Sequence, residues 1–149
     1  MKTGYQILDV MTTQPIKITK ENTVQSAAQV MKEKGVGSLL VTEKAKLVGI
    51  LTEKDIVVKL TVPGYHPSDV TVNQIMTKDV ITIEPGRDLY DAIVLMKNSD
   101  VRRLPVMDED NLMGIITLKD VLKIEPALFE LVQENINIRE FDRKNGLLD

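Results

Sequence analysis

Cysteine and tryptophan are absent from this chain of 149 residues, and histidine occurs only once. Without cysteine the chain has no disulfide framework, no thiolate zinc site and no cysteine nucleophile. His66 lies among proline, glycine and serine with no second metal ligand nearby, so we expect a histidine of a surface loop. The glycine patterns of dinucleotide-binding and P-loop enzymes are also missing. We therefore expect a protein that is not an enzyme.

Long apolar segments are lacking too. The longest apolar runs are about five residues, whereas a membrane-spanning helix needs roughly 20. The first ten residues contain no apolar core of a signal peptide. We expect a cytoplasmic protein that does not enter the membrane.

No excess of positive charge is present. The chain has 19 basic and 22 acidic residues, which gives a net charge of -3, and its sequence pI is near 5.3. Nucleic-acid binders usually present a basic surface, often with aromatic side chains that stack on bases, but aromatic residues make up 3% of this chain. The composition thus argues against nucleic acid as a partner. Its 43% of hydrophobic residues is typical of a globular protein with a buried core.

An internal repeat organises most of the sequence. A shift of 65 positions aligns residues 11–56 with residues 76–121 without a gap, and 16 of the 46 aligned positions are identical. Two copies without a third argue against a solenoid, which needs several stacked units. The repeat therefore favours two similar units packed on each other.

The first half of each copy predicts a strand and then a helix. Residues 15–18 and 80–83 alternate between apolar and polar side chains, as half-buried strands do. The helix that follows has a capping residue at its start, which is Asn22 or Thr23 in the first copy and Asp88 in the second.

The second half of each copy predicts a hairpin and a short helix. Residues 38–42 and 47–51 are β-rich runs joined by a polar turn. The corresponding turn of the second copy, 108–111, is acidic, but its spacing does not fit a calcium-binding loop. The last helix begins at Thr52 or Thr117, in the pattern of a capping box.

The order of these elements predicts an α/β protein of the α+β type. We expect two β-α-β-β-α repeats, packed sheet to sheet about a pseudo-twofold axis. The first domain is predicted over residues 7–60 and the second over 75–124, with a loop-like linker at 61–74 that contains proline, glycine and serine. Residues 125–149 predict a helix over 126–134 and then a polar tail.

A seven-residue motif, Gly-Ile-x-Thr-x-Lys-Asp, occurs in both copies at residues 49–55 and 114–120. A threonine and an aspartate three residues apart satisfy the first turn of a helix by themselves, so a structural role accounts for them. The same hydroxyl and carboxylate at a strand-to-helix junction can also hold the diol of a ribose. The spacing leaves both roles open.

The sequence resembles a tandem pair of cystathionine-β-synthase-type (CBS) domains over about residues 7–124. The resemblance is carried by the Met-Thr pairs at 11–12 and 76–77, by the stretch Val-Arg-Arg-Leu-Pro-Val-Met-Asp at 101–108, and by the two motifs. It implies a module that binds adenosyl ligands in two sites built by both copies, usually as a regulator.

The resemblance also implies which residues build each site. One site is expected to combine residues of the first motif with residues of the second copy: Ile50, Thr52, Lys54 and Asp55 with Val80, Ile81, Val101, Arg102 and Arg103. The other site is expected to combine residues of the second motif with residues of the first copy: Ile115, Thr117, Lys119 and Asp120 with Pro15, Ile16, Val36, Gly37 and Ser38. Aliphatic residues are expected to enclose the base, and threonine and aspartate to hold the ribose. Because only the first of these sites has an arginine pair, we expect it to bind AMP more tightly.

These features predict a regulatory sensor of AMP, ADP or ATP that acts on an unidentified partner protein without catalysis. The alternatives are a regulator that binds S-adenosylmethionine and a nucleic-acid-binding or interaction scaffold. We expect no metal and no cofactor besides the adenosyl ligand. We also expect a homodimer, because CBS domain pairs generally associate through their helical faces.

Overall fold

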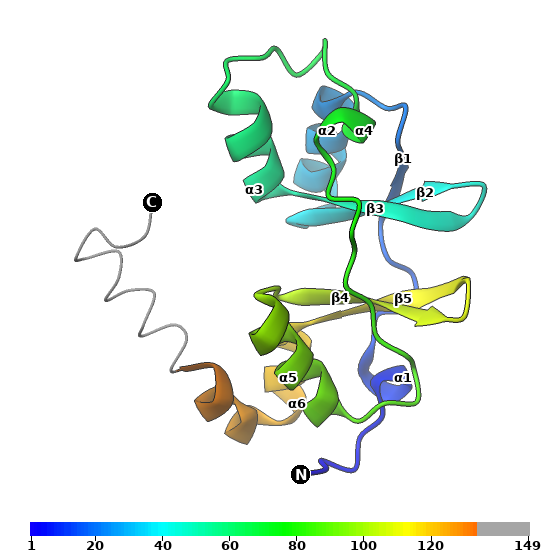
Figure 1. The fold of residues 1–149 in the computed structure, drawn as a ribbon, viewed down its shortest axis with the longest axis vertical. Coiled ribbons are helices and arrows are strands. Elements are labelled where there is room, and N and C mark those ends of the chain that lie inside the picture. The colour runs from blue at the N-terminus through cyan, green and yellow to red at the C-terminus, as the bar shows by residue number, and fades with distance from the viewer. Residues whose placement is uncertain (134–149) are drawn as a thin grey trace. The chain divides into compact units, whose positions relative to one another are not determined.

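The computed structural model describes residues 1–133, and Figure 1 shows its fold. The described chain forms two compact units. The first-repeat unit contains Gln14–Val80 and Glu109–Leu112. The second-repeat unit contains Met1–Thr13, Ile81–Asp108 and the described residues from Met113 onward.

A three-stranded sheet forms the centre of the first-repeat unit. Its strands are β1 (Lys17–Thr19), β2 (Ser38–Glu43) and β3 (Lys46–Thr52), in that order across the sheet. β1 runs parallel to β2, and β3 runs antiparallel to β2. The connecting residues Lys44 and Ala45 both have positive φ angles, as a tight hairpin turn requires. The predicted hairpin is confirmed, with strand bounds that differ by one residue.

Helix α2 (Val24–Lys34) packs on one face of this sheet (Figure 1). It begins after Thr23, whose side chain accepts a hydrogen bond of 3.1 Å from the N–H of Ser26. It ends at Gly35, which adopts the left-handed conformation that glycine tolerates. The predicted cap at Thr23 is confirmed.

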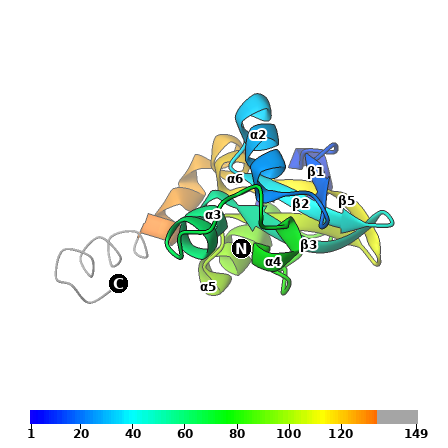
Figure 2. The same ribbon diagram turned by 90° about the horizontal axis from the view of Figure 1, so that it is seen from above.

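Three short helical segments complete the first-repeat unit, which Figure 2 shows from above. They are α3 (Glu53–Ile56), the π-helical turn η1 (Val57–Thr61) and α4 (Val72–Ile75). The loop predicted over 61–74 is therefore wrong at its end. Thr71 and Gln74 form a capping box that starts α4, and this Thr-x-x-Gln spacing is a helix signal visible in the sequence.

The second-repeat unit follows the same plan with a two-stranded sheet. Its elements are α1 (Ile7–Val10), α5 (Leu89–Ser99), β4 (Arg103–Asp108), β5 (Asn111–Thr117), α6 (Leu118–Ile124) and the 3-10 helix η2 (Pro126–Leu128). Residues 129–133 are also helical. The helix predicted over 126–134 is present as far as the described residues extend, and the predicted tail lies outside them.

The strand predicted over 80–83 is wrong. Only Ile83 forms a β-bridge there. In the first-repeat unit the N–H of Leu40 donates a hydrogen bond of 3.1 Å to the carbonyl of Ile16 and so extends the pairing. The residue equivalent to Leu40 is Pro105, which has no N–H to donate. Proline thus reduces the strand to a single bridge.

Each unit is completed by the segment that opens the other copy in the sequence. Thr12, from the start of the first copy, exchanges backbone hydrogen bonds of 2.9 and 3.0 Å with Ile115 in the second-repeat unit. Thr77, from the start of the second copy, exchanges two bonds of 2.9 Å with Ile50 in the first-repeat unit. The compact units therefore do not coincide with the sequence repeats. The predicted α+β class with two related repeats is confirmed, and the packing of the units stays a prediction.

Asp88 fastens the N-terminal segment to the second-repeat unit. Its carboxylate accepts hydrogen bonds from the N–H of Thr3 (2.9 and 3.0 Å), from the Thr3 hydroxyl (2.8 Å) and from the N–H of Gly4 (3.0 Å). It also caps α5 by accepting from the N–H of Tyr90 (2.8 Å). Burial by itself raises the pKa of Asp88, but these hydrogen bonds outweigh burial and lower the pKa to about 2.

The segments that contain Thr12 and Thr77, which we call the exchanged segments, pass close to the motif glycines. A Cβ atom on Gly114 would stand 2.3 Å from the carbonyl oxygen of Thr12. On Gly49 the nearest atom would be Sδ of Met76 at 2.7 Å, and the nearest backbone atom would be 3.0 Å away. A flexible side-chain end can move aside more easily than a backbone carbonyl. Glycine is thus required more strictly at position 114.

We predict that Asp88→Ala lowers the free energy of unfolding by about 2 kcal/mol, because it removes both a helix cap and the N-terminal clamp. Thr23→Ala, at the equivalent position, removes only a cap and should cost about 1 kcal/mol. The folded-state pKa lies below the ordinary 3.8, so the Asp88 contribution is complete above about pH 4 and is lost as the pH falls toward 2. Denaturant unfolding across this pH range measures both effects. Equal losses in the two variants at neutral pH would contradict the clamp.

We also predict that Gly114→Ala destabilises the chain by about 2 to 3 kcal/mol, because the added methyl group pushes away the backbone at Thr12. Gly49→Ala is the matched change and should cost about 1 kcal/mol, since the Met76 side chain can rotate. Hydrogen exchange at the N–H of Thr12 should accelerate only in Gly114→Ala. Unchanged protection of this N–H would show that the close approach is relieved elsewhere.

Candidate ligand-binding site

In both units the motif threonine ends a strand and caps the next helix. Thr52 Oγ1 accepts from the N–H of Asp55 (3.2 Å), and Asp55 Oδ2 accepts from the N–H of Thr52 (3.0 Å). The equivalent distances between Thr117 and Asp120 are both 3.1 Å. Both predicted capping boxes are confirmed, so the motif has a structural role in each copy.

Asp55 is enclosed by its own unit. Its side chain is the buried charged group of the described chain, and the residue is only 7% exposed. Oδ2 also accepts from the Thr52 hydroxyl (3.0 Å). Oδ1 forms an ion pair with Lys59 Nζ (3.0 Å) and lies 3.4 Å from the Thr77 hydroxyl. Both carboxylate oxygens of Asp55 therefore have partners within the first-repeat unit.

Asp120 has a different environment at the same point of the fold. Its Oδ2 caps α6, but within residues 1–133 its Oδ1 has neither a hydrogen bond nor an ion pair. The residue is partly exposed. The position that corresponds to Lys59 is Ile124, which cannot pair with a carboxylate. Asp120 thus keeps an acceptor oxygen for a ligand.

The other predicted motif residues occupy equivalent places. Ile50 lies on β3 and Ile115 on β5, where each pairs with an exchanged segment. Lys54 and Lys119 are exposed on the first turns of α3 and α6, and neither makes an ion pair with another described residue. Both lysines are therefore available to an anion.

The loops before β2 and β4 differ in charge. The first of these loops ends with Val36 and Gly37, and Ser38 begins β2; the equivalent residues of the second copy are Val101 and Arg102 in the loop and Arg103 at the start of β4. Each loop is tied to the helix of its own unit, since the carbonyl of Gly37 accepts from Glu53 N–H (3.1 Å) and that of Arg102 accepts from Leu118 N–H (2.8 Å). The structure thus places Arg102 at the start of the helix that carries Asp120. The residue combinations that the resemblance implies across the two units stay predictions.

The remaining predicted residues lie just before β1 and at the equivalent positions of the second copy, where only a single β-bridge forms. Pro15 and Ile16 precede β1, and the Ile16 carbonyl accepts a hydrogen bond from β2. Val80 and Ile81 precede the single bridge of the second copy. In the described part of the chain the Ile81 carbonyl accepts no hydrogen bond. The residue equivalent to the donor Leu40 is Pro105, which has no N–H. This carbonyl is free to accept from a ligand.

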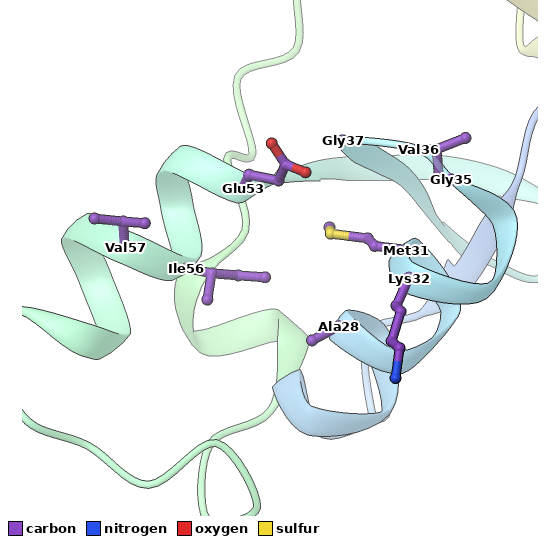
Figure 3. A pocket seen from close by; sticks show the side chains of 9 residues that line it. All are labelled: Ala28, Met31, Lys32, Gly35, Val36, Gly37, Glu53, Ile56 and Val57. Atoms are coloured by element: carbon purple, nitrogen blue, oxygen red, sulfur yellow. The ribbon is translucent and has the colours of Figure 1, made fainter.

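A pocket of about 620 Å³ lies between α2 and α3 of the first-repeat unit (Figure 3). Figure 3 shows Met31 and Ile56 pointing toward each other across it, with the Glu53 carboxylate beside Gly37. The pocket includes Val36 and Gly37 of the predicted site, but the rest of its lining was not anticipated: Ala28, Met31, Lys32, Gly35, Glu53, Ile56 and Val57. Their helical spacing indicates a helix face, and that pattern does not distinguish a pocket from ordinary core.

Lys59 contacts a motif residue but was not among the residues predicted for the site. It follows Asp55 by four residues, which is the spacing of an ion pair on a helix, so the sequence contained a local signal. Its second contact, from Nζ to the carbonyl of Ile75 (3.0 Å), depends on the exchanged segment and has no sequence signal.

Two further features are absent from residues 1–133. No helix there is long and apolar enough to cross a membrane. No three histidine, cysteine, aspartate or glutamate side chains of this region gather into a group that could hold a metal ion. His66 is exposed, and its ring nitrogen Nδ1 lies 2.6 Å from the Ser68 hydroxyl, which confirms its place in a surface loop.

Comparison with known proteins places these two units in a family. The family model of the CBS domain matches residues 7–61 and 72–126. The chain is 36% identical over 115 residues to the CBS domain-containing protein YhcV of Bacillus subtilis, covering 77% of this chain and 81% of that protein. It is 37% identical over 130 residues to an uncharacterized protein of Methanopyrus kandleri, covering 86% of this chain. The chain spans 64% of the length of that second relative.

A solved structure gives the same result. The crystal structure of an uncharacterized conserved protein from Pyrococcus horikoshii matches with a TM-score of 0.77 at 30% identity, covering 83% of this chain and 94% of that one. The two matched ranges also agree with the two repeats and their twin Thr-x-x-Asp junctions. The chain therefore belongs to the CBS domain family and contains two CBS domains.

Proposed function

We propose that this protein is a regulatory module that binds an adenine nucleotide (AMP, ADP or ATP) and acts on a partner protein without catalysis of its own. CBS domain pairs are a regulatory module family that often binds adenosyl ligands. Both units have the Thr-x-x-Asp junction that the family resemblance assigns to the ribose. The family and the junction support the same class of ligand.

The observation that carries the proposal is the junction of Thr117 and Asp120. Asp120 Oδ2 is used to cap α6, whereas Oδ1 has no partner among the described residues and the side chain is partly exposed. A carboxylate at a strand-to-helix junction holds the ribose hydroxyls in other nucleotide-binding folds. Asp120 has the free acceptor that this contact needs.

Arg102 and Arg103 favour a phosphorylated ligand. Arg102 is exposed just before β4, and its carbonyl accepts a hydrogen bond from the N–H of Leu118, the first residue of α6. A guanidinium group matches phosphate oxygens with two parallel hydrogen bonds, whereas S-adenosylmethionine has no phosphate. We therefore favour AMP, ADP or ATP and make S-adenosylmethionine an outcome of the test.

We predict that the double variant Arg102→Ala with Arg103→Ala weakens AMP binding by about ten- to hundred-fold and adenosine binding much less, because only AMP has a phosphate. Isothermal titration calorimetry with AMP, adenosine and S-adenosylmethionine measures the three affinities. Arg87→Ala is the matched control, since Arg87 is an exposed arginine that pairs with Asp91 elsewhere on the unit. Equal losses for AMP and adenosine would assign the arginines a structural role, and preference for S-adenosylmethionine would replace the proposed ligand.

We also propose that the protein forms a homodimer through the pocket between α2 and α3. The pocket is lined mainly by apolar groups, and Val57 at its edge is 56% exposed. Lys32 and Glu53 line the same pocket with opposite charges. A surface with both charges can pair with its own copy in a twofold contact, lysine to glutamate and glutamate to lysine.

We predict that Val57→Glu weakens the dimer by about ten-fold or more, because it buries an unpaired carboxylate at an apolar contact. Val62→Glu is the matched control, since Val62 is 75% exposed and does not line the pocket. Sedimentation velocity over a range of concentrations measures the dissociation constant of each variant. A wild-type chain that stays monomeric at tens of micromolar would refute the dimer.

A further inference from the structure

The two motif aspartates occupy the same position in the backbone of their units, but their carboxylates differ in the number of partners. Asp55 makes the cap contacts and also accepts from the Thr52 hydroxyl, Lys59 and Thr77. Asp120 makes the cap contacts alone, as judged over the described residues. The sequence repeat hides this difference, because the motif itself is identical at both aspartates.

Lys59 is the origin of the difference. It lies in the π-helical turn η1, four residues after Asp55, and its Nζ atom is 3.0 Å from Asp55 Oδ1. The same Nζ donates to the carbonyl of Ile75 at 3.0 Å. Lys59 thus contacts two acceptors on different elements. Its position is therefore fixed more firmly than a single surface ion pair would fix it. The equivalent residue in the second-repeat unit is Ile124.

A ribose diol donates two hydroxyl hydrogens, and it needs acceptor oxygens that are not already occupied. At Asp55 the diol would have to displace the Lys59 ammonium and the Thr77 hydroxyl, and the ammonium would lose a charged partner. At Asp120 the diol would displace no group of residues 1–133 from Oδ1. The same ligand therefore gains far more at Asp120, since a hydrogen bond to a charged group is lost at the other site.

We propose that Lys59 closes the carboxylate of Asp55, and that Asp120 is the single ribose-binding carboxylate of the chain. This inference rests on the proposed function, because it names which of the two junctions takes the adenosyl ligand. It replaces the expectation that the Asp55 site binds AMP more tightly on account of the arginines. One adenosyl ligand is bound per chain.

A reciprocal exchange of the two equivalent residues tests the proposal. Lys59→Ile removes the closing cation, and Ile124→Lys adds one four residues after Asp120, within reach of Oδ1. Ile124 is 43% exposed, so α6 should accept the lysine. Lys59→Arg and Ile124→Gln are the matched controls, because the first keeps the positive charge and the second adds a polar group without charge.

Calorimetry with adenosine and with 2′,3′-dideoxyadenosine separates the diol contact from phosphate and base contacts. We expect one adenosine per chain in the wild type, and a loss of about ten- to hundred-fold in adenosine affinity in Ile124→Lys. We expect a second binding event in Lys59→Ile. Dideoxyadenosine should bind weakly and equally to all chains, and both control variants should bind one adenosine.

Three results would overturn the inference while leaving the proposed function in place. They are two adenosine sites in the wild type, unchanged affinity in Ile124→Lys, and a folded Lys59→Ile that still binds one adenosine. Ile124→Lys lies outside the first-repeat unit, so this arm gives an answer even where Lys59→Ile does not fold.

Carbodiimide labelling of carboxylates, read by mass spectrometry, tests the closure without any ligand. Asp120 should be labelled in the wild type and protected in Ile124→Lys, and Asp55 should be labelled only in Lys59→Ile. Labelling of Asp55 in the wild type would overturn the closure. If this pattern holds and no chain binds adenosine, the closure by Lys59 stands and the proposed function fails.

Discussion

The rest of the structure depends on one pair of backbone hydrogen bonds that occurs once in each unit. Ile50 and Thr77 exchange these bonds in the first-repeat unit, and Ile115 and Thr12 exchange them in the second. They hold a segment from a distant part of the sequence against the strand that leads into the motif. The motif glycine is needed because this segment passes directly over it. The capping box begins two residues after the paired isoleucine, so the closure of the unit and the placement of the candidate ligand groups are set by the same few residues.

The two units share this backbone arrangement but not its electrostatics. Position 59 is a lysine and the equivalent position 124 is an isoleucine, so Asp55 is paired with a cation, whereas Oδ1 of Asp120 has no partner among residues 1–133. A glycine and an arginine at positions 37 and 102 make the neighbouring loops neutral and basic. Both copies therefore share the same backbone geometry, but they differ in charge at these two positions. Under the proposed function, this difference makes the second-repeat unit better suited to an anionic nucleotide.

Local features of the fold were predictable from the sequence, and features that depend on distant partners were not. The caps at Thr23, Thr52 and Thr117 need only residues within one helical turn, so their spacing sufficed. The lost strand near Ile83 depends on Pro105, which is recognisable only when its pairing partner is known. The exchanged segments depend on pairing across tens of residues, and no periodicity encodes such pairing. For the candidate site the same division applies, because the motif residues were found while the contact from Lys59 to the Ile75 carbonyl was not.

An aspartate that caps a helix and also binds a ligand needs one carboxylate oxygen for each contact. At Asp120 the cap uses Oδ2, so a ligand on Oδ1 does not compete with the start of α6. At Asp55 a ligand would need the oxygen that holds Lys59, and releasing Lys59 would also free the Ile75 carbonyl. That carbonyl belongs to the segment whose Thr77 completes the first-repeat unit, so binding there would loosen the unit's closure. A regulatory ligand shifts an equilibrium only through unequal affinity for two states, and it stabilises the state that it binds. Under the proposal, a ligand bound at Asp120 would stabilise an intact unit, whereas a ligand bound at Asp55 would weaken the contacts that close the first-repeat unit. This difference is a physical reason for a pair of CBS domains to keep one junction closed.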